Sequence, residues 1–217
     1  MTTYNIRMLA GCAAMLAIGA GALPATTITN LGTGQVPGTV GTASDPIWRI
    51  ISAPTGNTTG AAVLIGDPIP VWGAAPAGLH WIATDPLPAN PGGSQYAPGD
   101  YQYETTIYCA YTCLLTFSIK ADNAVNVFLN GLGPPHLIYS WGDPTGTYNS
   151  GWATFSPVQT ITTGFVVGMN TLDLVVHNNG GQTGVLLQGE FTCAPEPATV
   201  AFLASGLGLI ALGRWRR

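Results

Sequence analysis

The sequence predicts an all-β protein built as a single β-sandwich. Short runs rich in β-branched and aromatic residues alternate with Asp-Pro, Pro-Gly, Asn-Gly and Gly-Gly pairs, which are typical of turns. Between residues 26 and 194, no long stretch repeats its apolar residues with the period of a helix. Charged residues make up only 7% of the chain, and 29 glycines and 17 prolines indicate many loops. These features favour a loop-rich, exported β-protein.

Ten runs are expected to form strands, and about 150 residues in short strands are enough for one two-sheet core. The expected strands cover residues 48–52, 61–65, 79–83, 101–107, 114–120, 124–129, 137–140, 158–162, 171–177 and 185–191. The sandwich domain is accordingly assigned to residues 45–193. The preceding segment, residues 26–44, is rich in Thr and Gly and forms either a flexible spacer or an edge strand.

Residues 1–25 have the pattern of a secretory signal peptide. Arg7 is the only charged residue before an apolar run at 8–22, and small residues offer cleavage near Ala22 or Ala25. We therefore expect the general secretion machinery to export the chain, and Cys12 to leave with the signal peptide.

The last segment, residues 194–217, combines three features in a fixed order. Pro195, Glu196 and Pro197 come first, followed by an uncharged run at 198–213 and then by Arg214, Arg216 and Arg217. A helix over this run would be roughly 24 Å long, which is marginal for a bilayer core of about 30 Å. The segment is thus expected to span a membrane transiently, with the arginines on the cytoplasmic side.

This arrangement resembles the PEP-CTERM sorting signal of Gram-negative bacteria that make extracellular polysaccharide. The resemblance implies that an exosortase, a membrane cysteine transpeptidase, cleaves near the Pro-Glu-Pro motif. It also implies a location in the cell envelope or the extracellular matrix. The alternative is an ordinary C-terminal membrane anchor behind a chance Pro-Glu-Pro sequence.

A second resemblance concerns the predicted sandwich. Residues 122–131 read as a turn, an alternating strand and an Asn-Gly turn, and residues 170–181 read as a strand that enters a Gly-rich turn. Together with Gly-Asp-Tyr-Gln-Tyr at 99–103, these segments look like a galactose-binding-like sandwich with a jelly-roll-like arrangement. Such folds carry sugar binding, adhesion or purely structural roles, so the resemblance does not by itself assign a function.

The charge balance excludes one class of partner. Between residues 26 and 194 the basic residues are Arg49 and Lys120 alone, against nine acidic residues. Nucleic-acid binding requires clustered Lys and Arg to displace counterions from the phosphates. No such cluster exists in this part of the chain, so nucleic acid is not expected as a partner.

Three cysteines remain after removal of the signal peptide. In an oxidising compartment one disulfide is expected, with one sulfur left over. Cys109–Cys113 is favoured because the short segment between them can fold back as a tight turn. Pairing of Cys193 with either residue stays open. A metal site is disfavoured because the Cys-x3-Cys spacing has no second pair.

No catalytic motif is recognised, and the protein is expected not to be an enzyme. The chain has no nucleophile elbow, zinc-protease motif or phosphate-binding loop. Carboxylates are numerous, but no spacing selects a glycosidase pair. The carboxylates that precede proline are interpreted as solvated turn residues; they are Asp45, Asp67, Asp85 and Asp143.

No cofactor is expected. A structural calcium ion, for which oxygen ligands are the natural donors, is left open as an alternative. The candidates by residue type are Asp122, Asn123, Asp173 and Glu190. Turn capping and solvated charge are the alternative roles of these residues.

The candidate ligand site is a set of loop aromatics. Trp141, Tyr148 and Trp152 lie in a connection rich in Gly and Asn, where exposed rings would stack on a sugar. The alternative is that both tryptophans cover the end of the core. The leading hypothesis is a non-enzymatic envelope or matrix protein that binds extracellular polysaccharide. A secreted carbohydrate-active enzyme with a carboxylate pair and a ligand-free structural matrix protein are the alternatives.

Overall fold

The computed structural model describes residues 26–35, 43–55, 59–65, 72–85, 96–110, 112–145 and 150–194. The predicted signal peptide, the Pro-Glu-Pro motif, the terminal arginines and Tyr148 lie outside these residues. Within the described part, no helix combines the length and the hydropathy that crossing a bilayer requires.

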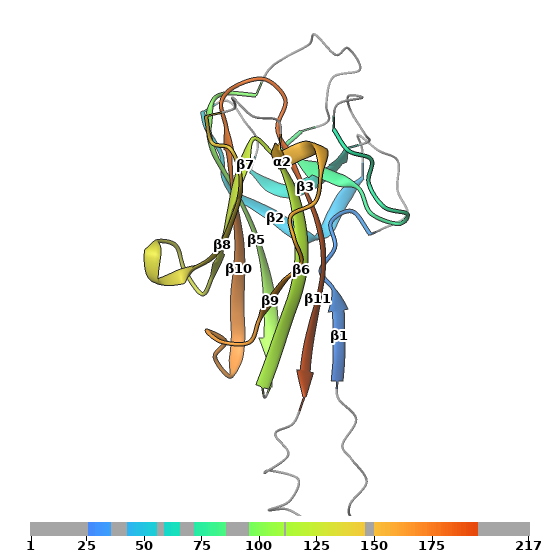
Figure 1. Cartoon of the computed structure of the whole chain (residues 1–217), viewed down its shortest axis with the longest axis vertical. Coiled ribbons are helices and arrows are strands. Elements are labelled where there is room, and N and C mark those ends of the chain that lie inside the picture. The colour runs from blue at the N-terminus through green and yellow to red at the C-terminus, as the bar shows by residue number, and fades with distance from the viewer. Residues whose placement is uncertain are drawn as a thin grey trace, which may run out of the picture.

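The described chain is almost entirely β-structure, as the sequence predicts (Figure 1). All ten predicted strands are present, most of them longer than expected, and an eleventh, β1, precedes them. The strands are β1 (Thr26–Asn30), β2 (Ser44–Ser52), β3 (Gly60–Ile65), β4 (Trp81–Ala83), β5 (Gly99–Cys109), β6 (Thr112–Asp122), β7 (Ala124–Leu129), β8 (Leu137–Gly142), β9 (Gln159–Ile161), β10 (Gly168–Asn178) and β11 (Gly184–Ala194). The helical pieces are the one-turn helix α2 (Ser150–Ala153) and a 3-10 turn at Pro134–His136.

All strands belong to one antiparallel sheet that curls into two layers. The strand order is β8-β7-β10-β5-β2-β3-β4-β11-β6-β9, and β1 pairs with β11 beside that path. Figure 1 shows β5, β7, β8 and β10 in one layer and β1, β6, β9 and β11 in the other. The rings of Phe117 on β6 and Tyr139 on β8 are 5.8 Å apart, so strands near the two ends of the path face each other. This arrangement confirms the all-β sandwich.

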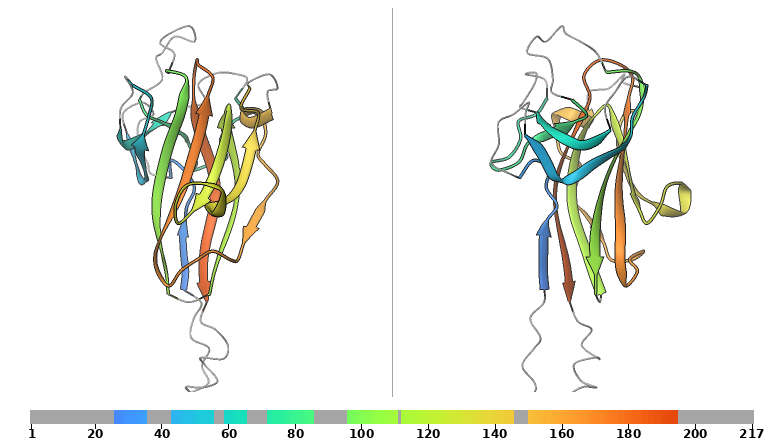
Figure 2. Two further views of the ribbon diagram at one scale, coloured as in Figure 1. Left: turned by 90° about the vertical axis from the view of Figure 1, so that its left-hand side faces the viewer. Right: turned by 180° about the vertical axis from the view of Figure 1, so that it is seen from behind.

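Strand β1 settles the role of part of the Thr- and Gly-rich segment. Thr26 lies opposite Cys193 and Asn30 opposite Glu190, so residues 26–30 form an edge strand and not a spacer. The two ends of the described chain therefore leave the sandwich side by side (Figure 2). We call this end the base; it carries Cys109, Cys113, Gly168 and Ala194, which the strand registers place together.

The core follows the period-2 alternation of the strands. On β5, Tyr101, Tyr103, Thr105 and Ile107 are buried, while the residues that alternate with them are more exposed. On the neighbouring strand β10, the buried Leu174 and Val176 lie opposite Tyr103 and Tyr101. The largest fully buried side chains are Trp48, Trp81, Tyr101, Tyr103, Phe117 and Phe191. The bulkiest side chains of the core are thus aromatic, and aliphatic residues pack around them.

Asp45 was predicted to be a solvated turn residue, and that prediction is wrong. Its side chain is only 3% exposed. Its Oδ2 accepts a hydrogen bond from the backbone N–H of Gly34 at 2.6 Å, and its Oδ1 accepts from Ile47 and Trp48 at 2.8 and 2.9 Å. Gly34 has φ of 66°, and a Cβ there would lie 2.5 Å from His80, so only glycine fits. Asp45 therefore fastens the loop after β1 to the start of β2.

Asp45→Ala is expected to lower the free energy of unfolding by about 3 kcal/mol, because three backbone N–H groups lose a charged acceptor in a buried place. Urea unfolding at pH 7 measures the loss. Asp45→Asn keeps one oxygen acceptor and should lose about half as much. A loss below about 0.5 kcal/mol in the alanine variant, typical of surface positions, would contradict the buried role of this carboxylate.

Candidate functional site

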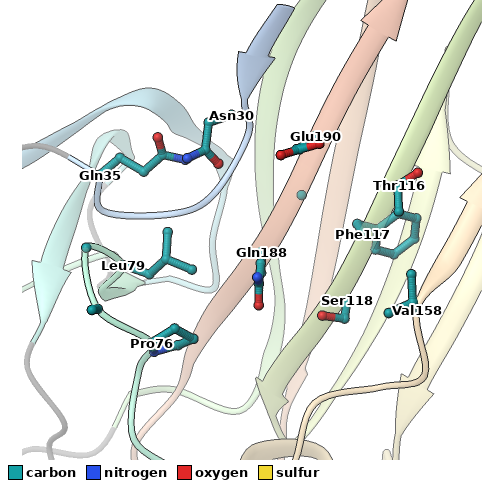
Figure 3. A pocket seen from close by; sticks show the side chains of 13 residues that line it. Asn30, Gln35, Pro76, Leu79, Thr116, Phe117, Ser118, Val158, Gln188 and Glu190 are labelled. Atoms are coloured by element: carbon teal, nitrogen blue, oxygen red, sulfur yellow. The ribbon is translucent and has the colours of Figure 1, made fainter.

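A groove lies on the outer face of β6 and β11. Its volume is about 570 Å³. Gln188 and Glu190 are exposed because they alternate with the buried Leu187 and Phe191 along β11. The register places Gln188 opposite Ser118 and Glu190 opposite Thr116, and residues directly opposite share a face. These four side chains form the floor (Figure 3).

The loop after β1, residues 76–79 and Val158 wall the groove, and backbone hydrogen bonds fix the first of these segments to the floor. The backbone N–H groups of Leu31 and Thr33 donate to the carbonyls of Gly189 and Leu187 at 2.8 and 3.0 Å. On this loop, the Gln35 amide donates to the carbonyl of Gly32 at 3.0 Å. The remaining walls include Pro76, Leu79 and Val158 (Figure 3). The groove is thus built in advance of any ligand.

The lining combines uncharged hydrogen-bonding groups with apolar walls. Amide groups come from Asn30, Gln35 and Gln188, and hydroxyl groups from Thr116 and Ser118. Amides and hydroxyls both donate and accept, as the hydroxyl groups of a sugar do. Among the described residues that line the groove, Glu190 is the one carboxylate, and none is basic. Glycosidases typically use two carboxyl groups on either side of the scissile bond, and the described lining of this groove supplies one.

The two described tryptophans of the predicted aromatic platform lie elsewhere. Trp141 on β8 is opposite Val125 on β7, and Val125 is buried, so Trp141 points between the layers. Its Nε1 is buried and has no hydrogen-bond partner. Trp152, on α2, also packs against the core. Both tryptophans therefore pack against the core, as in the alternative in which they cover its end. Tyr148 lies outside the described residues.

Trp141 nevertheless lines a second, smaller cavity on the other layer. This cavity has a volume of about 280 Å³ and includes Asp100, Asn126, Ser140 and His177. His177 Nδ1 is 2.8 Å from Asp100 Oδ1, and its Nε2 is 3.1 Å from Asn179 Oδ1. Exposed pairs of this kind contribute little to stability.

The structure does not gather the calcium candidates. The Asp173 Oδ1 accepts from the Gln102 amide at 2.8 Å, and the Asn123 Oδ1 accepts from the backbone of Asn179 at 2.9 Å. Glu190 lies in the groove, on the other layer from Asp173. Among the residues that the structure describes, three side chains of the types that can bind a metal come together only in the cysteine cluster, and not at these oxygen ligands.

One carboxylate pair does face across strands. Glu104 on β5 lies opposite Asp173 on β10. Asp173 is buried, and burial raises the pKa of its carboxyl. The hydrogen bond from Gln102 lowers this pKa, but by less. Neither residue lines either of the two cavities described above. The pair therefore gives no support to a hydrolytic site in them.

The cysteine cluster was only partly anticipated. Cys109, Cys113 and Cys193 are all buried at the base, and their sulfur atoms lie within 4.8 Å of one another. Cys113 is paired both with Cys109, as predicted, and with Cys193. Because a sulfur atom forms one disulfide at a time, these are two alternative bonds that share Cys113. One disulfide together with one remaining thiol carries no charge. Three buried thiolates would instead carry three negative charges and would need cations to balance them.

The two bonds differ in the length of chain that they close. The sequence separation is 4 for Cys109–Cys113 and 80 for Cys113–Cys193. Cys109→Ser leaves the bond that closes the long segment, so reduction should lower its free energy of unfolding by about 4 kcal/mol. Cys193→Ser leaves the bond that closes the short segment, and reduction should lower its free energy of unfolding by about 2 kcal/mol. Urea unfolding with and without a phosphine reductant measures both. A reductant response in Cys113→Ser would contradict the role of Cys113 as the shared partner.

Asp122 is a buried carboxylate that the sequence pattern did not single out as such. It ends β6, it is 8% exposed, and its Oδ2 accepts from the indole of Trp72 at 3.1 Å. Burial raises the pKa of its carboxyl to about 7. Trp72 in turn lies 4.4 Å from the ring of Trp81. The carboxylate thus holds the segment after residue 71 against the end of the sandwich that is opposite the base.

This pKa shift predicts a pH dependence. Since the folded chain holds the Asp122 proton more tightly than the unfolded chain, stability is full at pH 4 and falls as the pH rises to about 7. The Asp122→Asn variant has no carboxyl to titrate, so its free energy of unfolding should not fall in this way. Between pH 4 and pH 8 it should therefore rise by up to about 4 kcal/mol relative to that of the natural chain. Urea unfolding across this range measures the difference. A difference independent of pH would contradict the shifted pKa.

Comparisons with known proteins find a fold likeness and no family. No protein-family model matches the chain. No curated protein matches it either. Solved structures match across most of the chain, all at low identity. A K3 cleaved adhesin domain of Lys-gingipain from Porphyromonas gingivalis w83 is 14% identical with a TM-score of 0.43, covering 79% of this chain and 100% of that one.

Two carbohydrate-binding modules are also among the similar structures. The CBM36-1 domain of a multidomain xylanase from the hindgut metagenome of Trinervitermes trinervoides is 14% identical, with a TM-score of 0.35, and covers 67% of this chain and 94% of that one. A CBM35 from Paenibacillus barcinonensis is 19% identical, with a TM-score of 0.34, and covers 67% and 98%. Similarity this low carries no argument about a ligand of this chain.

Proposed function

We propose that this chain is an exported, non-enzymatic envelope or matrix protein that binds a neutral polysaccharide in the groove over β6 and β11. The single observation that supports the proposal is the lining of that groove. Amides, hydroxyls and one carboxylate stand on a rigid strand pair between apolar walls. Sugar rings combine hydroxyl groups with apolar C–H faces, and this lining offers partners to both.

Charge narrows the class of glycan. Glu190 lies in the groove, and the chain between residues 26 and 194 has nine acidic residues against two basic ones. Uronic-acid or sulfated polysaccharides would be repelled by this field. A neutral polysaccharide is therefore the ligand class that we propose.

The proposal for export and sorting rests on the sequence. Residues 1–25 read as a signal peptide, and residues 195–217 read as a sorting signal for an exosortase. A buried disulfide is typical of proteins that fold in an oxidising compartment, and the cysteine cluster is consistent with export. Processing at the Pro-Glu-Pro motif would release or attach the sandwich outside the cell.

The test of the groove is affinity electrophoresis of the purified chain in gels that contain neutral or anionic polysaccharides. Replacing Gln188 and Glu190 together by alanine should weaken retention by neutral glycan roughly tenfold, because hydrogen bonds on the floor are lost. Both side chains are exposed, so the fold should survive the change. The control is Asn126→Ala, an exposed amide outside the groove.

The outcomes separate the surfaces. Retention that is lost only with Gln188 and Glu190 supports the groove. Retention that is instead lost in Trp141→Ala or Trp152→Ala variants of confirmed fold would move the site to the predicted aromatics. No retention of the natural chain by any neutral glycan would contradict sugar binding and leave a structural matrix protein.

A further inference from the structure

Exposed apolar side chains gather at the base of the sandwich. Val166 and Val167 are 53% and 78% exposed in the turn that leads into β10. Next to this turn, Met169 on β10 lies opposite Tyr108 on β5, and these side chains are 61% and 56% exposed. Figures 1 and 2 show this turn at the lower end of the molecule, where β5 and β11 also end. We call these four residues the apolar tip.

Buried amides hold the turn in place. Asn170, which is 1% exposed, accepts from the backbone N–H of Val166 at 2.8 Å and donates to its carbonyl at 2.8 Å. Asn130 donates to Asn170 Oδ1 at 2.8 Å and to the carbonyl of Gly164 at 3.0 Å. The two valines are therefore presented by a turn that is hydrogen-bonded at both ends.

The preceding residue anchors the turn from inside. Phe165 packs against the core, with its ring 5.4 Å from that of Phe191 on β11. Consecutive apolar residues thus divide their roles, because Phe165 points inward while Val166 and Val167 point out. Core packing does not explain the apolar character of the two outward residues.

The described residues of the base also carry no charged side chain. No charged residue occurs between Glu104 and Lys120, between Asp143 and Asp173, or between Glu190 and Glu196. These are the stretches that form the β5–β6 hairpin, the turn before β10 and the end of β11. Side chains that reach the apolar region beneath the lipid headgroups must lack charge in this way, while the acidic remainder of the sandwich stays in water.

The chain leaves the described structure at the same end. Ala194 lies opposite Thr112 in the β11–β6 register, so whatever follows starts from the base. The residues that follow, 195–217, contain a run of 16 uncharged residues and then three arginines. If this run enters a bilayer, the apolar tip is the part of the sandwich nearest the lipid.

We propose that the apolar tip is a lipid-contacting surface, which seats the base of the sandwich on the bilayer while the chain still carries its C-terminal segment. Val166 and Val167 enter the headgroup region, and Tyr108 lies at the interface, where tyrosine is enriched. This inference rests on the membrane segment of the proposed function and not on glycan binding. The groove, on the outer face of β6 and β11, stays accessible.

The experiment uses the full chain reconstituted in phosphatidylcholine vesicles. Val167→Trp adds an indole at the tip, and Leu132→Trp adds one at an exposed apolar position in the β7–β8 connection, away from the tip. Vesicles made with brominated lipids quench indoles that touch the acyl chains. Emission added by Val167→Trp should be blue-shifted and largely lost on bromination, whereas emission added by Leu132→Trp should remain. The native tryptophans contribute equally to both and are subtracted.

A second pair of variants tests the orientation. Replacing Val166 and Val167 by serine should expose the 162–169 peptide to hydrogen exchange on vesicles, whereas Leu132→Ser together with Leu137→Ser should leave its protection unchanged. Equal quenching of both added tryptophans, or failure of the full chain to float with vesicles, would overturn the proposal. So would a dimer in detergent that the serine substitutions at the tip dissociate, since a second copy would then cover the patch. Glycan retention in gels is read separately, so the two proposals fail independently.

Discussion

Strand β11 pairs with β6 along its whole length, from Gly184 opposite Asp122 to Ala194 opposite Thr112. On its other edge it pairs with β4 near one end and with β1 near the other. This strand therefore links the two halves of the sheet and joins the edge strand to the core. Because all these pairings are antiparallel, the alternation of β11 fixes which side chains face the core and which face water.

The two faces of β11 have different tasks. Leu187 and Phe191 point inward and pack with the aromatic core, while Gln188 and Glu190 point outward and form the floor of the groove. The same hydrogen bonds that hold the loop after β1 against β11 also build a wall of the groove. Stability and the candidate binding surface thus depend on one strand, so the floor is rigid before a ligand arrives.

Polar groups are distributed unequally along the sandwich. Near the end opposite the base, Asp122 is buried beside Trp72, and Lys120 donates to the carbonyl of Ala74 at 3.2 Å while lying 4.7 Å from the centre of the Phe155 ring. At the base, the buried groups include the three cysteines and the uncharged amide of Asn170, and the exposed residues of the apolar tip carry no charge. Burying ions is costly, so these buried charged groups lie where backbone or indole groups can form hydrogen bonds with them, and the buried Asp173 accepts one from the Gln102 amide. Among the described residues, no buried charged group lies at the base, which agrees with the lipid contact that we propose there.

The sequence alone determined the strands, because alternation and turn residues are local signals that need no knowledge of the partner strand. All ten predicted strands are found, and the excess of acid over base is a property of composition. Only the tertiary structure decided the burial of Asp45, the inward direction of Trp141 and the meeting of three cysteines. Each depends on register or on contacts between distant segments, and the groove itself combines residues from Asn30 to Glu190. A period of two tells which residues share a face, but only strand pairing decides whether that face meets the core, water or another strand.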